Sequence, residues 1–357
     1  MTYSIVALDP VTGDLGVATQ SKFPAVGAVV PWARADAGAI ATQSFANVTY
    51  GPNGLAMLAA GSSAADSLAR LVAEDVLREQ RQAGIVDRHG GAATHTGREC
   101  FAWAGGRTGK GYAAQGNILA GGAVVDGIAE TFEAGGQPFA ELLVACLRAA
   151  EAAGGDRRGR QSAALLIVRE GGGYGGGNDR LMDIRIDEHE DPVPELARVL
   201  DLHRLYLDRP PVESLLPVDE TLGRELRRHL ETLGAGPGSR FASVYQPMWQ
   251  VLGEQAPPPA QGPDGTSGSG TAESGIAGGG PPGGAEDAER PFVGEPRPLP
   301  VGWDDAWQDA LTAWMGVENL EARAAAPGWI DPRVLGFLRE KATASRSPAG
   351  DRQVSAE

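Results

Sequence analysis

The sequence predicts an α+β fold: a four-layer αββα sandwich of two antiparallel sheets with helices on both outer faces, followed by a small helical C-terminal domain. Three observations support this class. Predicted strands come in pairs joined by turns rich in Gly, Pro and Asp, which is typical of antiparallel hairpins and excludes a parallel Rossmann sheet. Predicted helices come in pairs between groups of strands. A Gly- and Pro-rich stretch then separates the sandwich from the last helices.

The predicted strands are short segments with apolar or alternating side chains. The turn Asp9–Asp14 joins the first two strands, and Arg88–Gly91 joins a later pair. The expected strands cover residues 3–8, 16–20, 39–44, 83–87, 92–95, 100–104, 111–115, 162–168 and 181–186.

The predicted helices begin at recognisable caps. The Gly-Pro-Asn-Gly sequence at 51–54 predicts a turn before the first helix, and Ser62 or Ser63 caps the second. Asp191 caps a later helix with Pro192 at its first position, where a missing N–H is tolerated. The expected helices cover residues 55–60, 63 to about 81, 123–134 and 138–153, with one more starting at 192.

The length of 357 residues predicts two domains, since a domain usually holds roughly 100–200 residues. We expect the sandwich at 1–208 and a split helical domain at 212–236 and 303–341. Residues 255–300 contain few large apolar side chains and are expected to be a disordered linker or insertion, spanning roughly 40 Å as a coil. Residues 342–357 are expected to be a flexible tail.

Charge and cysteine content exclude several functions. The chain has 31 Lys and Arg against 46 Asp and Glu, a net charge of −15, which argues against nucleic acid or anionic lipid as partners. No apolar run is long enough to span a membrane. The beginning of the sequence lacks a secretion signal, and Cys100 and Cys146 are the only cysteines, so a cytoplasmic location is expected. A homo-oligomer remains open.

Several motifs that suggest ligands have simpler explanations. The Gly-rich segment Gly105–Gly111 lacks the Gly and Ser or Thr positions of a phosphate-binding loop and is interpreted as a hairpin turn. Gly171–Gly177 lies between two predicted strands and is interpreted as a mobile loop. The acidic segment Asp187–Asp191 precedes a helix, where carboxylates favour the positive end of the dipole. The histidines show no zinc spacing, so no metal or cofactor is expected.

The beginning of the sequence offers a nucleophile. Met1 is followed by Thr2, which is small enough for the methionine to be removed, and the predicted strand 3–8 follows directly. An N-terminal threonine combines a nucleophilic hydroxyl with its own α-amine, whose usual pKa of roughly 7.7–8.0 allows it to act as a base near neutral pH. Met-Thr also begins many proteins without such chemistry.

Four segments resemble a bacterial family known as domain of unknown function 1028. They are Thr2–Ala7, Ser21–Gly27, Gln115–Asn117 and Gly155–Ala163, and the resemblance extends over about residues 2–208. That family is similar in fold to the N-terminal nucleophile (Ntn) hydrolases, which include the proteasome β-subunits. The resemblance therefore implies an Ntn-like sandwich for the first domain.

The resemblance also implies a catalytic set. Thr2 would be the nucleophile, and Lys22 would lower the pKa of its amine or orient it. Gln20 stands where the related enzymes have an acid, which departs from their pattern. Asn117 lies in the segment that matches the loop closing around the amine. Asp156 and Ser162 would hold that amine by hydrogen bonds.

Five further residues are expected to contact the substrate. Ser44, together with Phe45, supplies candidate backbone N–H donors for an oxyanion. The guanidinium groups near position 157 can bind a carboxylate. Ordinary structural roles, as turn formers or solvated charges, remain open for most of these positions. The expected substrate contacts are Ser21, Ser44, Gln115, Arg157 and Arg158.

The C-terminal segments resemble a peptidoglycan-binding domain that follows the Ntn-like domain in many members of this family. Leu222–Leu233 and Trp303–Trp314 have apolar residues at helical spacing, and Trp329–Leu338 completes the unit. The tryptophans are also consistent with a small helical core that has no ligand. Binding to cell-wall glycan is not expected, because no secretion signal is recognised.

Two functions are consistent with the sequence. In the first, Thr2 attacks an amide or related acyl carbon of a small molecule or peptide, forms an ester, and water releases it. In the second, the protein is a non-catalytic binding or scaffold protein that retains the fold.

Overall fold

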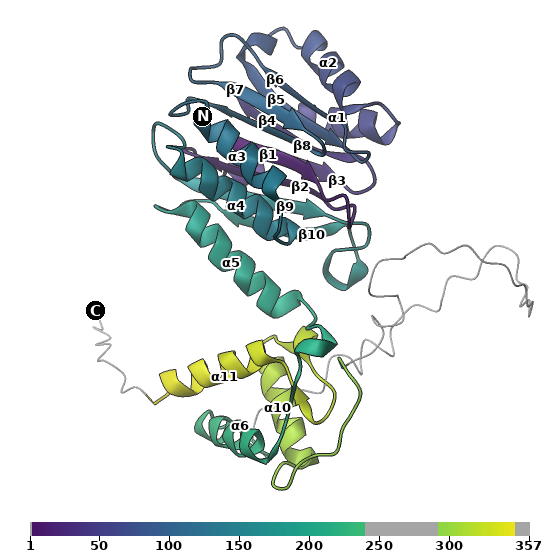
Figure 1. Cartoon of the computed structure of the whole chain (residues 1–357), viewed down its shortest axis with the longest axis vertical. Helices are drawn as coiled ribbons and strands as arrows, with labels where there is room; N and C mark the ends of the chain where they lie inside the picture. The colour runs from purple at the N-terminus through teal and green to yellow at the C-terminus, as the bar shows by residue number, and fades with distance from the viewer. Residues whose placement is uncertain (1, 240–291, 347–357) are drawn as a thin grey trace, which may run out of the picture. The chain divides into compact units, whose positions relative to one another are not determined.

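The computed structural model describes residues 2–239 and 292–346 (Figure 1). Contacts between residues divide the chain into two compact units, Met1–Asp201 and Leu202–Glu357, and each is described by itself. Most of the predicted linker and of the predicted tail lies outside the described residues.

The first unit contains a six-stranded antiparallel sheet in the order β10-β9-β2-β1-β8-β7. Strand β1 lies near its centre, paired with β2 on one side and β8 on the other. The first predicted hairpin is confirmed, as is the pair formed by β9 and β10. The strands are β1 (Thr2–Leu8), β2 (Leu15–Ser21), β7 (Gly105–Gly109), β8 (Tyr112–Asn117), β9 (Ser162–Val168) and β10 (Arg180–Ile186).

A four-stranded antiparallel sheet in the order β3-β4-β5-β6 packs on the first one. An apolar layer between the sheets includes Val6, Val17 and Val86. The hairpin around Arg88–Gly91 is confirmed. The strands are β3 (Pro31–Arg34), β4 (Gly38–Ser44), β5 (Arg81–Asp87) and β6 (Ala92–Thr96).

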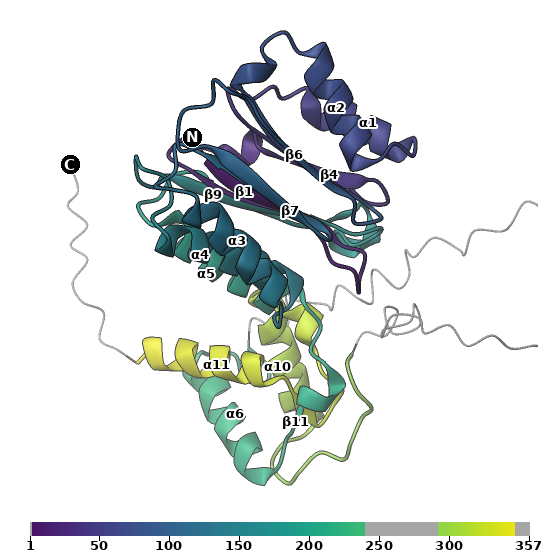
Figure 2. The same cartoon turned by 45° about the horizontal axis from the view of Figure 1, so that its top comes forward.

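Helices cover both outer faces of the sandwich, as Figure 2 shows. One core joins the six-stranded sheet to α3 and α4, and a separate core joins the four-stranded sheet to α1 and α2. The predicted four-layer α+β sandwich is therefore confirmed. The helices are α1 (Tyr50–Ala59), α2 (Ala64–Glu74), α3 (Ala123–Ala134), α4 (Phe139–Ala152) and α5 (Pro192–Leu207), which contains the division between the units.

The predicted turn at 51–54 is wrong, because these residues form the first turn of α1. Pro52 is tolerated there, since the N–H groups of a first turn have no intrahelical partner. Gly51 is required by packing: a Cβ at this position would lie 2.1 Å from the ring of Trp32. The glycine thus allows α1 to approach strand β3.

Three other local predictions need correction. The second helix, capped by Ser63, ends at Glu74 and not near residue 81, because Asp75 has an extended backbone. The segment 100–104 is not a strand. The Gly-rich segment interpreted as a turn is instead strand β7, followed by a short turn to β8. Strand β3, which begins with a proline at a sheet edge, was not predicted.

The second unit is a helical cluster around buried tryptophans. Trp303 and Trp314 are 1% and 3% exposed, and both pack on apolar residues of the helices. Asp219, Asp304 and Asp331 cap the three helices through their side chains. The elements are α6 (Glu220–Thr232), α10 (Asp305–Val317), α11 (Pro332–Ala344) and a small sheet of β11 (Leu216–Pro217) and β12 (Trp329–Ile330).

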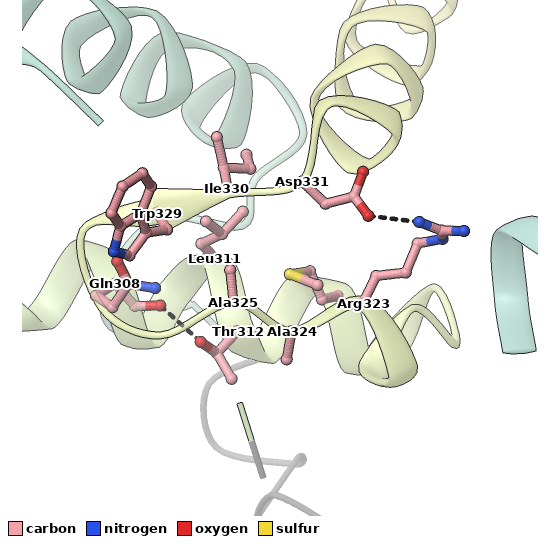
Figure 3. Close-up of a pocket in the computed structure, with 10 residues that line it drawn as sticks. Gln308, Leu311, Thr312, Arg323, Ala324, Ala325, Trp329, Ile330 and Asp331 are labelled. Carbon is pink, nitrogen blue, oxygen red and sulfur yellow. Dashed lines mark hydrogen bonds and ion pairs between the residues drawn. The ribbon is translucent and has the colours of Figure 1, made fainter. Parts of the chain in front are cut away.

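A small pocket in the second unit lies beside a buried ion pair (Figure 3). Arg323 and Asp331 are almost fully buried, and their side chains are joined at 2.5 Å. Gln308 and Thr312 of α10 also line this pocket, with the Thr312 hydroxyl bonded to the Gln308 carbonyl at 3.0 Å. The pair ties the segment before α11 to the turn after α10.

Candidate functional site

One end of the sandwich gathers the residues singled out in the sequence. Strand β1 begins at Thr2, and its neighbours β2 and β8 end at Ser21 and Asn117. Thr2 is the register partner of Asn117, while Ser21 is the partner of Ser162 at the start of β9. The antiparallel order of the sheet thus brings four distant parts of the chain to the same end of the sandwich.

The Thr2 side chain is buried against polar partners. It is 5% exposed, and its hydroxyl donates a hydrogen bond to Ser21 Oγ at 3.1 Å. Successive strand residues point to opposite faces, and Ser4 and Val6 contact the second sheet, so the Thr2 side chain lies on the face between the sheets. The hydroxyl is therefore enclosed at the end of the inter-sheet layer.

The Thr2 carbonyl is held by two side-chain amides. It accepts hydrogen bonds from Gln43 Nε2 at 3.2 Å and from Asn117 Nδ2 at 3.5 Å. Both amides also donate to Gln82 Oε1, at 2.8 and 2.9 Å, and Gln82 Nε2 donates to the Gly116 carbonyl at 2.8 Å. This network connects the two sheets and fixes the backbone of Thr2.

Sequence reasoning missed Gln43 and Gln82. Both are buried, on β4 and β5 of the sheet that faces Thr2. A signal was present, because each glutamine stands in or beside an apolar strand segment, where a polar side chain needs a partner. The identity of the partners depends on the packing of the two sheets, which the sequence does not specify.

Two residues beside this network have left-handed backbones. Ser44 has φ 70° and follows Gln43, and Ile118 has φ 53° and follows Asn117. This conformation is unfavourable for a β-branched residue such as isoleucine. Strained residues of this kind cluster at functional sites, where the surrounding structure holds them in place. Both strained positions directly follow the side chains that hold Thr2.

Asp156 and Ser162 hold the loop after β2. Asp156 Oδ2 accepts the Lys22 N–H at 3.1 Å, and its Oδ1 accepts the Arg158 N–H at 2.8 Å. Ser162 Oγ accepts the Val26 N–H at 3.1 Å and donates to a carbonyl of the same loop. These contacts place both residues in the support of the site.

The predicted cationic residues lie near the same end of the sandwich. The Lys22 ammonium donates to the Arg160 carbonyl at 3.2 Å. Arg158 forms an ion pair with Asp156, while Arg157 is exposed and its backbone N–H donates to the Ile118 carbonyl at 3.1 Å. Of these residues, Arg157 is hydrogen-bonded to Ile118, which directly follows Asn117.

Three other residues considered in the sequence make hydrogen bonds or face directions that do not involve the Thr2 hydroxyl. Gln115 is fully buried, and its amide donates to Ser4 Oγ at 2.7 Å, so it joins strands inside the sandwich. Gln20 pairs with Tyr3 and shares its face toward the helices, opposite to that of Thr2. The Phe45 N–H already donates to the Gln80 carbonyl at 3.3 Å, so it is not available to an oxyanion in this arrangement.

A buried ion pair supports the chain after Ser44. Arg81 binds Asp75 at 2.9 Å and also donates to the Phe45 carbonyl. Burial raises the pKa of Asp75. Hydrogen bonds from Asn47, Arg81 and a backbone N–H have a larger, opposite effect, and the resulting pKa is about 2. The charged carboxylate is therefore the form that this loop requires.

Asp75→Asn is expected to destabilise the first unit by roughly 2 kcal/mol near neutral pH, because the folded pKa lies below the unfolded one. That stability is present above the unfolded pKa near 4 and is lost as the pH falls to about 2. Urea unfolding at both pH values tests this, with the exposed Glu74→Gln as control. A stability difference between wild type and Asp75→Asn that persists near pH 2 would contradict it.

The structure thus defines an α+β sandwich with a buried threonine network at the ends of its central strands. The sequence model of a protein family described as "Family of unknown function (DUF1028)" matches residues 2–196, which is more than half of the chain. The chain therefore belongs to this family. The model described as "Putative peptidoglycan binding domain" matches residues 296–338. No curated protein matches the sequence.

A solved structure supports the assignment. The crystal structure of protein SPO2555 from Silicibacter pomeroyi, a member of the same family, is 31% identical. The match covers 57% of this chain and 89% of that chain, with a TM-score of 0.52. Among residues 2–239 and 292–346, no helix has the length and hydropathy needed to cross a bilayer.

Proposed function

We propose that this protein is an amidohydrolase that uses Thr2 as an N-terminal nucleophile, as the Ntn hydrolases do, to which its family is similar in fold. One observation carries the proposal: the Thr2 hydroxyl meets Ser21, and its carbonyl is held by two amides followed by strained residues. Because the network fixes the backbone, the hydroxyl has a defined position for attack.

The proposed reaction begins when removal of Met1 frees the α-amine of Thr2. The hydroxyl oxygen then bonds to the carbonyl carbon of the substrate amide, and the hydroxyl proton moves to the α-amine. The C–N bond breaks as the departing amine takes up a proton. The resulting ester on Thr2 is hydrolysed by water, which releases the acid and restores the hydroxyl.

The neighbouring residues have supporting roles in this mechanism. Ser21 accepts the hydrogen bond of the Thr2 hydroxyl and orients its oxygen. Gln43 and Asn117 hold the carbonyl of the same residue, and Asp156 fixes the backbone next to Lys22. The substrate is a small-molecule or peptide amide. We place the reaction in the cytoplasm, consistent with the free thiols of the two cysteines.

The proposal is tested by incubating a library of amides and short peptides with protein in which the α-amine of Thr2 is free. Release of acid and amine, followed by mass spectrometry, is the expected result. The same library with a variant that retains an extra residue before Thr2 serves as the control, because an amide nitrogen cannot act as the base. Equal hydrolysis by both proteins would contradict the mechanism, and hydrolysis by neither would favour a scaffold.

Lys22→Met is expected to shift the rising limb of the pH–rate profile upward by about half a unit. A nearby positive charge disfavours the protonated amine, so its removal raises the amine pKa and activity then requires a higher pH. Lys110→Met, an exposed lysine in the turn between β7 and β8, is the control. Profiles that coincide for wild type and Lys22→Met would exclude this role for Lys22.

A further inference from the structure

The end of the sandwich that holds Thr2 carries a set of exposed aromatic rings. Phe23, Phe45 and Phe101 are 49%, 54% and 59% exposed. Within residues 2–239 and 292–346 they are the only phenylalanines in the exposed class. Large apolar side chains that gather in one exposed area commonly mark a binding site.

Each ring is tied to a residue that contacts Thr2. Phe23 and Phe45 stand two residues after Ser21 and Gln43 respectively. The Phe101 carbonyl accepts the N–H of Ile118, the residue after Asn117, at 2.9 Å. Because these links are short, all three phenylalanines lie around the end of β1.

Two of these rings contact each other at this end of the sandwich. The centroids of Phe45 and Phe101 are 6.2 Å apart with the planes inclined at 57°, within the range of aromatic pairs. The backbone at Phe45 is fixed by Arg81, which donates to its carbonyl. The pair therefore forms an aromatic surface whose position is held by the surrounding structure.

A cation completes the arrangement. Arg157 is exposed, and its guanidinium makes no hydrogen bond or ion pair with the described part of the chain. Its N–H binds the Ile118 carbonyl, while the Ile118 N–H binds Phe101. Arg157 and Phe101 are thus both hydrogen-bonded to Ile118, the residue that follows Asn117. An arginine without a partner is suited to bidentate binding of a carboxylate.

We infer that this end of the sandwich binds amides that carry both an aromatic group and a carboxylate. The aromatic group packs on Phe45 and Phe101, and the carboxylate binds Arg157. The inference rests on the proposed function for turnover, but the binding itself does not require catalysis. Two isomeric arrangements satisfy this chemistry, with the ring on the acyl side or on the amine side of the scissile bond.

Binding is measured first in the Thr2→Ala variant, where turnover is removed. N-(3-phenylpropanoyl)glycine and N-acetylphenylalanine represent the two arrangements, and N-acetylglycine and 3-phenylpropanamide each lack one group. By titration calorimetry, at least one of the first two probes should bind about 10- to 100-fold more tightly than either truncated probe. Equal affinity for complete and truncated probes would overturn the inference.

Substitutions assign the contacts. In the Thr2→Ala background, Phe101→Ala should weaken the complete probe by about tenfold and leave N-acetylglycine unchanged, and Arg157→Ala should do the same with 3-phenylpropanamide as the unchanged probe. Tyr174→Ala, an exposed ring in the loop between β9 and β10, is the matched control. An equal loss in the control variant would overturn the assignment.

Turnover separates this inference from the proposed function. Preferential hydrolysis of a complete probe by the protein with a free Thr2 supports both. Selective binding without hydrolysis supports the binding site and contradicts the amidohydrolase. Hydrolysis of all four probes at equal rates supports the amidohydrolase and overturns the substrate class.

Discussion

Replacing Thr2 with alanine is expected to reduce the rate of amide hydrolysis by roughly 10³-fold or more, because the hydroxyl that forms the covalent intermediate is absent. Thr2→Ser should retain part of the activity, since it keeps both the hydroxyl and the α-amine. Neither change should unfold the protein, because the Thr2 carbonyl remains bound by Gln43 and Asn117. Steady-state kinetics on the best amide from the library measures the effect.

Ser21→Ala is the informative comparison for that experiment. It removes the partner of the Thr2 hydroxyl but leaves the nucleophile, so the rate should fall by about 10- to 100-fold only. Circular dichroism and thermal unfolding establish that each variant is folded. Wild-type rates in folded Thr2→Ala would assign the activity to another group and remove Thr2 from the mechanism.

Arg323→Ala is expected to destabilise the second unit by about 3–5 kcal/mol, because it leaves the buried Asp331 carboxylate without its charge partner. The loss extends beyond that pair. The same guanidinium donates to the carbonyls of Leu205 and Arg204 at 2.7 and 2.6 Å. Removing it therefore leaves three buried or half-buried acceptors unsatisfied.

Differential scanning calorimetry tests this prediction. The transition of the second unit should move to a lower temperature, while the first unit retains its own transition. Arg339→Ala is the control, since its ion pair with Glu225 is half-exposed and should contribute about 1 kcal/mol or less. A change for Arg323→Ala no larger than that of the control would contradict the role given to the buried pair.

The layers of the sandwich could be predicted from local pattern. The segments Ala123–Ala134 and Ser162–Val168 form a helix and a strand with the predicted bounds, because their apolar periodicity and flanking residues agree. The hairpin that begins the chain was predicted from its turn residues. Where the local signals are consistent with one another, the sequence was sufficient.

Elements stabilised by distant packing could not be predicted in this way. Gly51 and Pro52 resemble a turn, yet both lie in the first turn of α1, where Gly51 allows a close approach to Trp32. The glycines of β7 have weak strand propensity, and the strand forms because it pairs with β8. In both cases a contact between segments outweighs the local preference.

The candidate site shows the same division. Thr2, Ser21 and Asn117 were singled out through the family resemblance, and the structure brings them together because β2 and β8 flank β1. Gln43 and Gln82 were missed, since they come from the second sheet and meet Thr2 only when the sheets pack. The exposed rings of Phe23, Phe45 and Phe101 were missed for a related reason, since Phe45 was considered only for its backbone N–H. Exposure is a property of the folded surface, and the sequence alone shows only apolar residues.

The most direct test of the central claim is the intact mass of the protein after reaction with a β-lactone. Protein beginning at Thr2 should gain one acyl group, located on Thr2 by fragmentation, whereas protein with a residue retained before Thr2 should gain none. The difference is expected because only a free α-amine can take the hydroxyl proton. Equal labelling of both proteins, or labelling at a residue other than Thr2, would contradict the account.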